Sequence, residues 1–201
     1  MKQKQVSLFF TQEEIKEAAI RHKFLSKSEQ TTFYRVYQQL QNVVSVHIYE
    51  KQEKEELFVI ATLGEGVDRL QEQYETMGNY VMAYSIECLG MELLQKAYES
   101  IQQQYKKQGY YVKQFLYPGE HMPWKEMERI FLLVNQEEVR YNESWVMTPK
   151  KSVAMKMILT TRREEQCGNI CEQCKRTACS SRKGKREQRG TSYGYKRIFN
   201  T

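Results

Sequence analysis

Long apolar runs are missing from this 201-residue sequence. Because a transmembrane helix needs roughly 18 or more consecutive apolar residues, no membrane span is expected. Residues 1–6 also lack the longer apolar stretch and the small-residue cleavage site of a signal peptide. We therefore expect a cytoplasmic protein with no membrane partner.

Cysteine is scarce outside one short segment. Of the five cysteines, four lie between Cys167 and Cys179, and the fifth is Cys88. In a reducing compartment this distribution favours thiolates and argues against a disulfide scaffold. Cys88 falls near the start of a predicted helix, where it is most simply a small core residue.

Acidic residues are almost missing from the C-terminal end. From Lys175 onward there are nine Lys or Arg residues and one acid, Glu187, a net charge of +8. Since the whole chain carries +6, residues 1–174 carry −2. A hydrophobic fraction of 40% with 14 Tyr and 8 Phe is enough for a core, which argues against wholesale disorder. The sequence indicates one ordinary domain, residues 1–161, followed by a Cys-rich and basic tail, residues 162–201.

Helical and extended patterns mix along this domain. Thr11 and Glu14 fit a capping box, and Ser28 is expected to cap a second helix. The strands over 43–49 and 57–63 are predicted to form an antiparallel hairpin with a charged loop of about seven residues. Because strict βαβ alternation is missing, we expect an α+β fold, a twisted and mostly antiparallel sheet flanked by helices. The other expected elements are helices after Gly66, over 86–107 (ended by Gly109) and over 123–134, and strands over 110–116 and 153–161.

Two features are weak as signals of a site. His22 and His47 have no ligand-like neighbours in the sequence and are interpreted as surface or packing residues. The Gly64–Glu65–Gly66 loop joins a strand to a helix, an arrangement whose backbone N–H groups can hold phosphate. Because Glu65 would repel an anion, no nucleotide phosphate site is expected here.

The cysteine segment carries the sharpest chemical signal. Four thiolates within 13 residues can surround one tetrahedral Zn²⁺ ion or one iron–sulfur cluster. A segment with so few apolar residues would need a bound metal to stabilise its fold. The spacing does not decide between the two metals. It also resembles the cluster motif of radical S-adenosylmethionine enzymes, but only 27 residues follow Cys174, too few for the barrel that those enzymes need. The predicted ligands are Cys167, Cys171, Cys174 and Cys179.

The central stretch, residues 110–153, contains two turns marked by proline. Pro118–Gly119 is a turn signal because proline fixes φ and glycine accepts a positive φ. A second turn follows at Met147–Thr148–Pro149. Polar residues beside both turns, at the ends of apolar segments, are typical of binding loops and equally of plain connections.

Read in order, several pieces of this stretch resemble one family, the activation domain of vitamin B12-dependent methionine synthase and its free-standing bacterial relatives. The resemblance runs over roughly residues 10–161 and is clear from about 110. The pieces are Leu116 to Glu120, Trp124, Ile130–Phe131, Glu143–Ser144, Met147, Pro149 and Lys151 to Val153.

This resemblance implies an α+β domain that binds S-adenosylmethionine. The domain would deliver the ligand's methyl group to the cobalt of a cobalamin whose oxidised form is being re-reduced. The chain has no room for a cobalamin-binding domain, so the corrinoid would belong to a partner, a methionine synthase or related methyltransferase polypeptide, with a separate electron donor. An iron–sulfur cluster at the four cysteines could pass the electron.

The same resemblance implies a set of ligand-binding residues. A sulfonium ligand calls for a carboxylate, backbone donors, a cation and an aromatic wall, which Glu120, Gly119, Lys113 and Tyr117 could supply. Phe115 stands where the family has an arginine, and Lys113 is expected on the same strand face as a partial substitute. Gln95 stands where the long helix has a carboxylate, with Glu92 one turn away. The full implied set is Lys113, Tyr117, Pro118, Gly119, Glu120, Glu143, Ser144 and Ser152.

Two other functions remain open from the residues alone. A zinc knuckle followed by the basic and aromatic residues 182–197 would suit nucleic-acid binding, because lysine and arginine attract phosphate and tyrosine stacks on bases. The chain could also be a relative of the activation domain that no longer binds the ligand and acts only in assembly.

Overall fold

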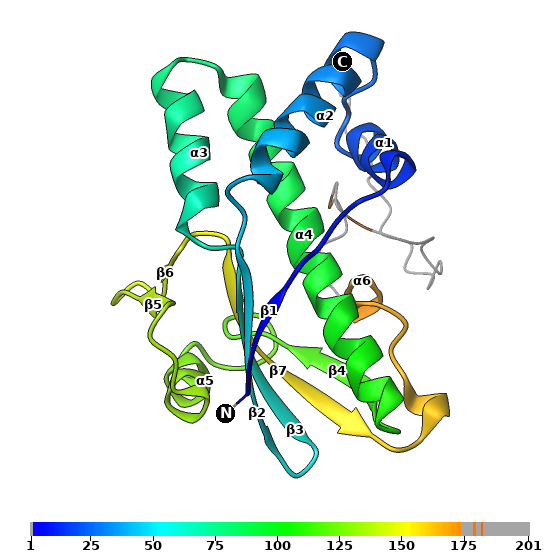
Figure 1. Cartoon of the computed structure of the whole chain (residues 1–201). Helices are drawn as coiled ribbons and strands as arrows, with labels where there is room; N and C mark the ends of the chain where they lie inside the picture. Colours follow the sequence, from blue (N-terminus) through cyan, green and yellow to red (C-terminus); the bar gives the residue numbers. More distant parts are fainter. Residues whose placement is uncertain (1, 174–178, 180–181, 183–201) are drawn as a thin grey trace, which may run out of the picture.

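Five antiparallel strands form one sheet in the order β1-β2-β3-β7-β4. The computed structural model describes residues 2–173, 179 and 182 (Figure 1). Every pairing within this sheet is antiparallel, so the predicted α+β class is confirmed. The strands are β1 (Lys2–Val6), β2 (Val46–Glu53), β3 (Glu56–Thr62), β7 (Ser152–Thr160) and β4 (Tyr111–Leu116).

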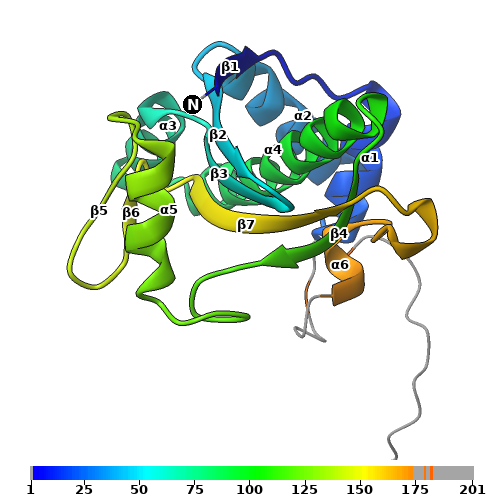
Figure 2. The same cartoon turned by 90° about the horizontal axis from the view of Figure 1, so that it is seen from below.

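Helices cover both faces of the sheet (Figure 2). The long helix α4 (Tyr80–Lys107) crosses one face together with α1 (Gln12–Arg21) and α2 (Lys27–Gln41). On the other face lie α5 (Glu126–Val134) and a small hairpin of β5 (Arg140–Tyr141) and β6 (Met147–Thr148). The described chain also contains α3 (Glu65–Thr76), the 3₁₀ helix η1 (Arg163–Glu165) and α6 (Ile170–Gln173).

Two hydrophobic clusters, one on each face, explain the apolar pattern of the central strand. Leu57 and Val59 of β3 pack toward α4, whereas Phe58 and Ile60 pack toward α5. Because both faces of β3 are buried, its residues are apolar in an unbroken run instead of alternating. Cys88 is fully buried in the larger cluster, as predicted.

The ends of the helices follow their local sequence. The Thr11 and Glu14 capping box is present. The second helix is capped by Ser26 and not by Ser28 as predicted, because Glu29 pairs with the residue three positions before it. At the end of α4 the N–H of Gly109 (φ +82°) donates to Lys106, and that of Tyr110 donates to Tyr105. This Schellman motif confirms the role predicted for Gly109.

The β2–β3 hairpin differs from the prediction. Glu53 pairs with Glu56, so the loop contains only Lys54 and Glu55 and the charged run belongs mostly to the strands. Lys54 adopts φ +55°, which fits the right-handed twist of a two-residue hairpin. This end of the hairpin is exposed, so its strand residues are charged. The sequence alone therefore predicted a loop where the strands continue.

The segment after β7 packs on the domain. Cys167 belongs to the larger hydrophobic cluster, and its N–H donates to the Val112 carbonyl at 2.9 Å. Ile170 packs against the same cluster. The division at residue 161 stays a prediction, although Cys167 and Ile170, beyond that boundary, pack on the core of the domain. None of the helices in the described part of the chain combines the length and apolar character that crossing a membrane requires.

Candidate functional site

The Pro118–Gly119 loop is a tight turn directly after β4. The carbonyl of Tyr117 accepts the N–H groups of His121 and Glu120 at 3.0 and 3.2 Å, and Gly119 N–H donates to Met122 O at 2.8 Å. Gly119 has φ +81°, and a Cβ there would lie 2.3 Å from the Trp124 ring. The loop therefore requires glycine for its conformation and for space.

Two implied ligand residues, Tyr117 and Glu120, belong to this loop. Glu120 is exposed, so its carboxylate is open to a ligand from solvent. The Tyr117 ring is half-buried and lies 5.9 Å from the His121 ring, in a tilted arrangement. Tyr117 and Glu120 are therefore neighbours in one turn, and their role toward a ligand stays a prediction.

Lys113 does not share a strand face with Phe115, which corrects the sequence-based expectation. A β-bulge between Val112 and Gln114 shifts the register of β4 on β7. As a result Val112 and Phe115 are both buried, while Lys113 is exposed and pairs with Glu165 at 2.8 Å. An extra residue in one strand reverses the alternation of side chains that follows it. Lys113 and Phe115 therefore point to different faces although they are two residues apart.

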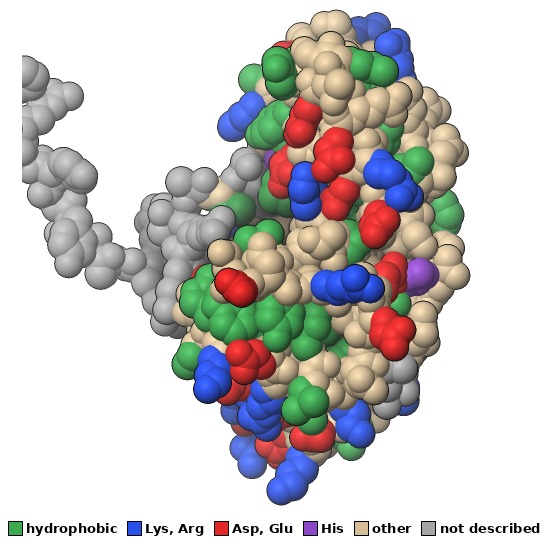
Figure 3. All heavy atoms as spheres, turned by 90° about the vertical axis from the view of Figure 1, so that its left-hand side faces the viewer, with side chains coloured by type: hydrophobic (Ala, Val, Ile, Leu, Met, Phe, Trp, Pro, Cys, Tyr) green, Lys and Arg blue, Asp and Glu red, His purple; other side chains and the backbone are tan. Residues whose placement is uncertain are grey.

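Glu143 and Ser144 lie at the exposed tip of the β5–β6 hairpin. The Asn142 side chain accepts the N–H groups of Ser144 and Val146, each at 3.0 Å, which fixes the tip. Trp145 adopts φ +63°, unusual for a bulky residue, and its ring stacks on Tyr141 at 5.5 Å. Apolar side chains gather on part of this side of the molecule (Figure 3).

Ser152 lies inside the sheet and not at its surface. It is buried, and its hydroxyl donates to Thr62 Oγ1 at 2.8 Å. Lys113 flanks the opposite end of β7, beside Ile158 and Leu159. Six or seven residues separate the two positions along this strand, about 20 Å at the usual rise. Lys113 and Ser152 therefore cannot contact the same small group.

Gln95 of α4 and Phe115 of β4 line one small crevice of about 10 Å³. The resemblance draws attention to these two positions, where the family has an arginine and a carboxylate. Asn169, Ile170 and Cys171 line the same crevice from the segment that carries α6. The structure thus brings the helix position and the strand position together and places a cysteine beside them.

Glu92, the alternative carboxylate on α4, is already engaged. It is 1% exposed and accepts from Arg21 Nε at 3.1 Å and contacts His22 Nε2 at 3.0 Å. Its carboxylate ties Arg21 and His22, at the end of α1, to α4. Glu92 is therefore a structural residue and not a ligand-side one.

The described cysteines of the C-terminal segment differ in exposure. Cys167 and Cys171 are buried, and Cys179 is half-buried. Burial, followed by the nearby Glu172 carboxylate, raises the pKa of Cys167 to about 12. Within residues 2–173, 179 and 182, no three His, Cys, Asp or Glu side chains form a metal-binding group. Cys174 lies outside the described residues, as does the basic run after Arg182, so the fit of a metal there stays a prediction.

The structure assembles one polar network that the sequence did not indicate. His47 Nδ1 lies 2.6 Å from Glu138 Oε2 and its Nε2 lies 3.4 Å from Ser45 Oγ. Tyr49 also donates to Glu138. Residues 45, 47 and 49 share one face by strand alternation, a signal that was available. Glu138 comes from the loop after α5, and nothing local in the sequence connects it to β2.

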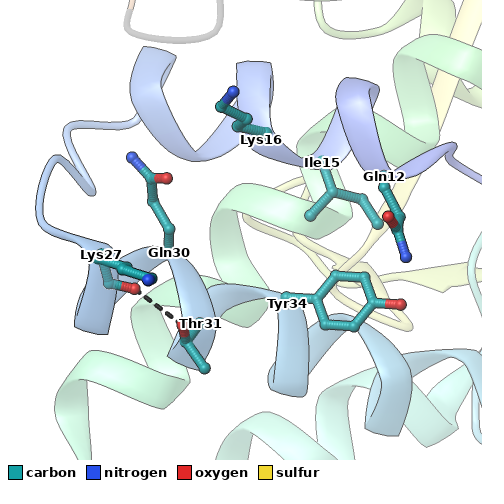
Figure 4. A pocket seen from close by; sticks show the side chains of 7 residues that line it. All are labelled: Gln12, Ile15, Lys16, Lys27, Gln30, Thr31 and Tyr34. Atoms are coloured by element: carbon teal, nitrogen blue, oxygen red, sulfur yellow. Dashed lines mark hydrogen bonds between the residues drawn. The ribbon is translucent and has the colours of Figure 1, made fainter.

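A separate groove of about 360 Å³ lies between α1 and α2 (Figure 4). Lys16 projects from α1, while Gln30, Thr31 and Tyr34 come from α2. The Thr31 hydroxyl donates to the Lys27 carbonyl at 2.8 Å, a bond within α2. None of the residues implied by the resemblance lines this groove.

Comparison of the chain with models of known protein families gives no match, and a search of curated proteins finds no relative. The resemblance therefore rests on the motifs of the central stretch.

Proposed function

We propose that this chain is a free-standing subunit that supports reductive activation of a corrinoid methyltransferase by binding S-adenosylmethionine. The corrinoid and the electron donor belong to partner polypeptides. The observation that carries the proposal is the meeting of Gln95 and Phe115 across one crevice. Those are the helix and strand positions that the resemblance assigns to the ligand side.

The surroundings of this crevice favour an organic cation. Gln95 offers an amide that can accept from an ammonium or donate to a carboxylate. Phe115 offers an aromatic face, and rings attract cations such as a sulfonium. In the loop after β4, the Tyr117 ring and the exposed Glu120 would supply a second wall and a negative charge.

The crevice as it stands is too small for the ligand. About 10 Å³ is close to the space that one water molecule needs. Binding therefore requires the segment of Asn169, Ile170 and Cys171 to move away from α4 and β4. The proposal thus couples ligand binding to the position of the cysteine segment.

Calorimetry with S-adenosylmethionine tests the proposal. We expect heat of binding in the wild type and a loss of about tenfold or more in affinity for Gln95→Leu, because a buried ligand group would lose its partner. Gln103→Leu, at an exposed position of α4, is the matched control and should bind as the wild type does. Lys113→Ala should also bind normally. Absence of heat and of thermal stabilisation at millimolar ligand would reject ligand binding.

The cysteine segment forms the second part of the proposal. We propose that Cys167, Cys171, Cys174 and Cys179 hold a zinc ion or an iron–sulfur cluster. Purification without oxygen, metal analysis and the visible spectrum distinguish these metals. A colourless protein with one zinc per chain would exclude electron transfer, and a metal-free protein would exclude both.

A further inference from the structure

Three side chains on one face of the sheet form a relay that ends at a hydroxyl. Ser45 directly precedes β2, and His47 follows it on the same face of the strand. His47 Nε2 lies 3.4 Å from Ser45 Oγ, while its Nδ1 lies 2.6 Å from Glu138 Oε2. A hydroxyl, an imidazole and a carboxylate in this order are the parts of an activated nucleophile.

The Glu138 contacts determine which nitrogen of His47 carries the proton. A carboxylate is acceptor-only, so the imidazole nitrogen beside it is the donor. In neutral His47 the proton therefore lies on Nδ1, and the Nε2 lone pair faces the Ser45 hydroxyl. This is the tautomer that a general base needs.

Tyr49 strengthens that assignment. Its hydroxyl donates to the same Glu138 oxygen. Burial, followed by the hydrogen bond to Glu138, raises the pKa of Tyr49 well above its usual range. The phenol therefore stays protonated and helps to hold the Glu138 carboxylate in position.

The relay is open to solvent and lies beside the start of a helix. The side chains of His47 and Glu138 are 21% and 29% exposed. A Cβ at Gly64, which precedes α3, would lie 3.3 Å from Ser45 Cβ, so the two residues touch. No side chain caps α3, and the Glu65 carboxylate pairs instead with Arg69 at 3.1 Å.

We infer that Ser45, His47 and Glu138 form a second site, a nucleophilic centre that cleaves small carboxylic esters entering from solvent. Ser45 and His47 are the catalytic residues, and Glu138 and Tyr49 are positioning residues. This site is independent of the proposed S-adenosylmethionine crevice, since it uses β2 and the loop after α5 instead of α4 and β4.

Each bond change in the reaction has a place in this geometry. Ser45 Oγ attacks the ester carbonyl carbon, and its proton passes to His47 Nε2. The carbon–oxygen bond to the alcohol breaks, and the alcohol leaves with that proton. Water then loses a proton to Nε2, attacks the acyl-serine and releases the carboxylic acid, which restores the Ser45 hydroxyl.

Covalent labelling of the full chain with an alkyl fluorophosphonate tests the inference. Attack by Ser45 displaces fluoride, so mass spectrometry should locate one phosphonate adduct on Ser45. The labelling rate should fall roughly 100-fold in His47→Ala, the lower end of the range for general base catalysis. Ser45→Ala should lose the adduct and the hydrolysis of p-nitrophenyl acetate. Ser7→Ala, an exposed serine outside the relay, should react as the wild type does.

Two results would overturn the inference. One is a folded wild type, verified by circular dichroism, that gains no adduct on Ser45. The other is equal labelling of the wild type and a folded His47→Ala. Nitrogen-15 NMR of His47 at pH 8 adds a readout that needs no reaction. It should show the proton on Nδ1, with a shift toward Nε2 in Glu138→Ala, and a wild type with the proton on Nε2 would contradict the relay.

Discussion

His22 and Glu92 form a buried pair between α1 and α4, with 3.0 Å between His22 Nε2 and Glu92 Oε1. Arg21 approaches the same carboxylate through Nε and Nη2, at 3.1 and 3.3 Å. His22 and Glu92 are 2% and 1% exposed. Because the Glu92 carboxylate is removed from water, its contacts with Arg21 and His22 help to fix α1 to the long helix.

Removing the Glu92 carboxylate should be strongly destabilising. Glu92→Ala leaves His22 and Arg21 without their acceptor, and breaking a buried pair in this way costs about 3–5 kcal/mol. Urea unfolding measures the loss. Glu17→Ala, at an exposed position of α1, should change the free energy of unfolding by at most about 0.5 kcal/mol. Similar losses in the two variants would show that Glu92 is not the anchor.

Gly119→Ala should destabilise the loop after β4 for two separate reasons. A left-handed φ costs alanine roughly 1–2 kcal/mol, and the new Cβ meets the Trp124 ring, which adds about 1–3 kcal/mol of overpacking. Gly78→Ala is the matched control, since Gly78 has φ +71° but nothing within 4 Å of its Cβ position. The midpoints of thermal unfolding of the two variants, each relative to the wild type, measure the difference. Equal losses would mean that the ring moves aside freely.

The acid stability of the protein should depend on Glu29. The hydrogen bond from the Ser26 backbone, followed by the Ser26 hydroxyl, lowers the pKa of Glu29 from 4.5. A depressed folded-state pKa contributes stability above the unfolded value that is lost as pH falls through the folded value. The midpoint of thermal unfolding, followed downward from pH 6, should therefore fall less steeply below about pH 4.5 in Glu29→Gln. Parallel curves for the wild type and the variant would refute this.

Cys88 should resist alkylation in the native state. Burial first, with nearby carboxylates adding to it, raises the pKa of Cys88 to about 11. An unfolded cysteine has a pKa of about 8.5. At pH 8 the reactive thiolate fraction of unfolded Cys88 is therefore roughly 100-fold larger than that of folded Cys88. We expect iodoacetamide to label Cys88 at least roughly 100-fold more slowly in the native protein than in denaturant. Peptide mass spectrometry measures both rates. Equal rates would mean that α4 opens readily.

The fold class was predictable because the periodic patterns were strong. Phe33, Val36 and Leu40 repeat at helical spacing, and they are fully buried on α2. β1 was not predicted, since Lys2 to Gln5 alternate lysine and glutamine and show no apolar signal. This strand exists because β2 offers it partners for hydrogen bonds, a tertiary effect that local propensity does not record.

The candidate sites were less predictable, and the reason is distance along the chain. His22 read as a lone histidine because its partner, Glu92, lies 70 residues away. His47 read the same way, with Glu138 a further 91 residues along. The bulge at Lys113 was also hidden, because one extra residue leaves no mark in the composition of β4. The Gly119 turn was predictable, since its geometry is local.

The two outer strands of the sheet have consequences for self-association. Open strand edges invite pairing with another copy, which leads to aggregates. The β1 edge carries Lys2 and Lys4, whose charges disfavour such pairing, and the segment of Cys167 returns along the β4 edge and occupies the Val112 carbonyl. A tag that displaces residues 2–6 would uncover the hydrogen-bonding edge of β2, so tags placed at the other end should give the more soluble protein.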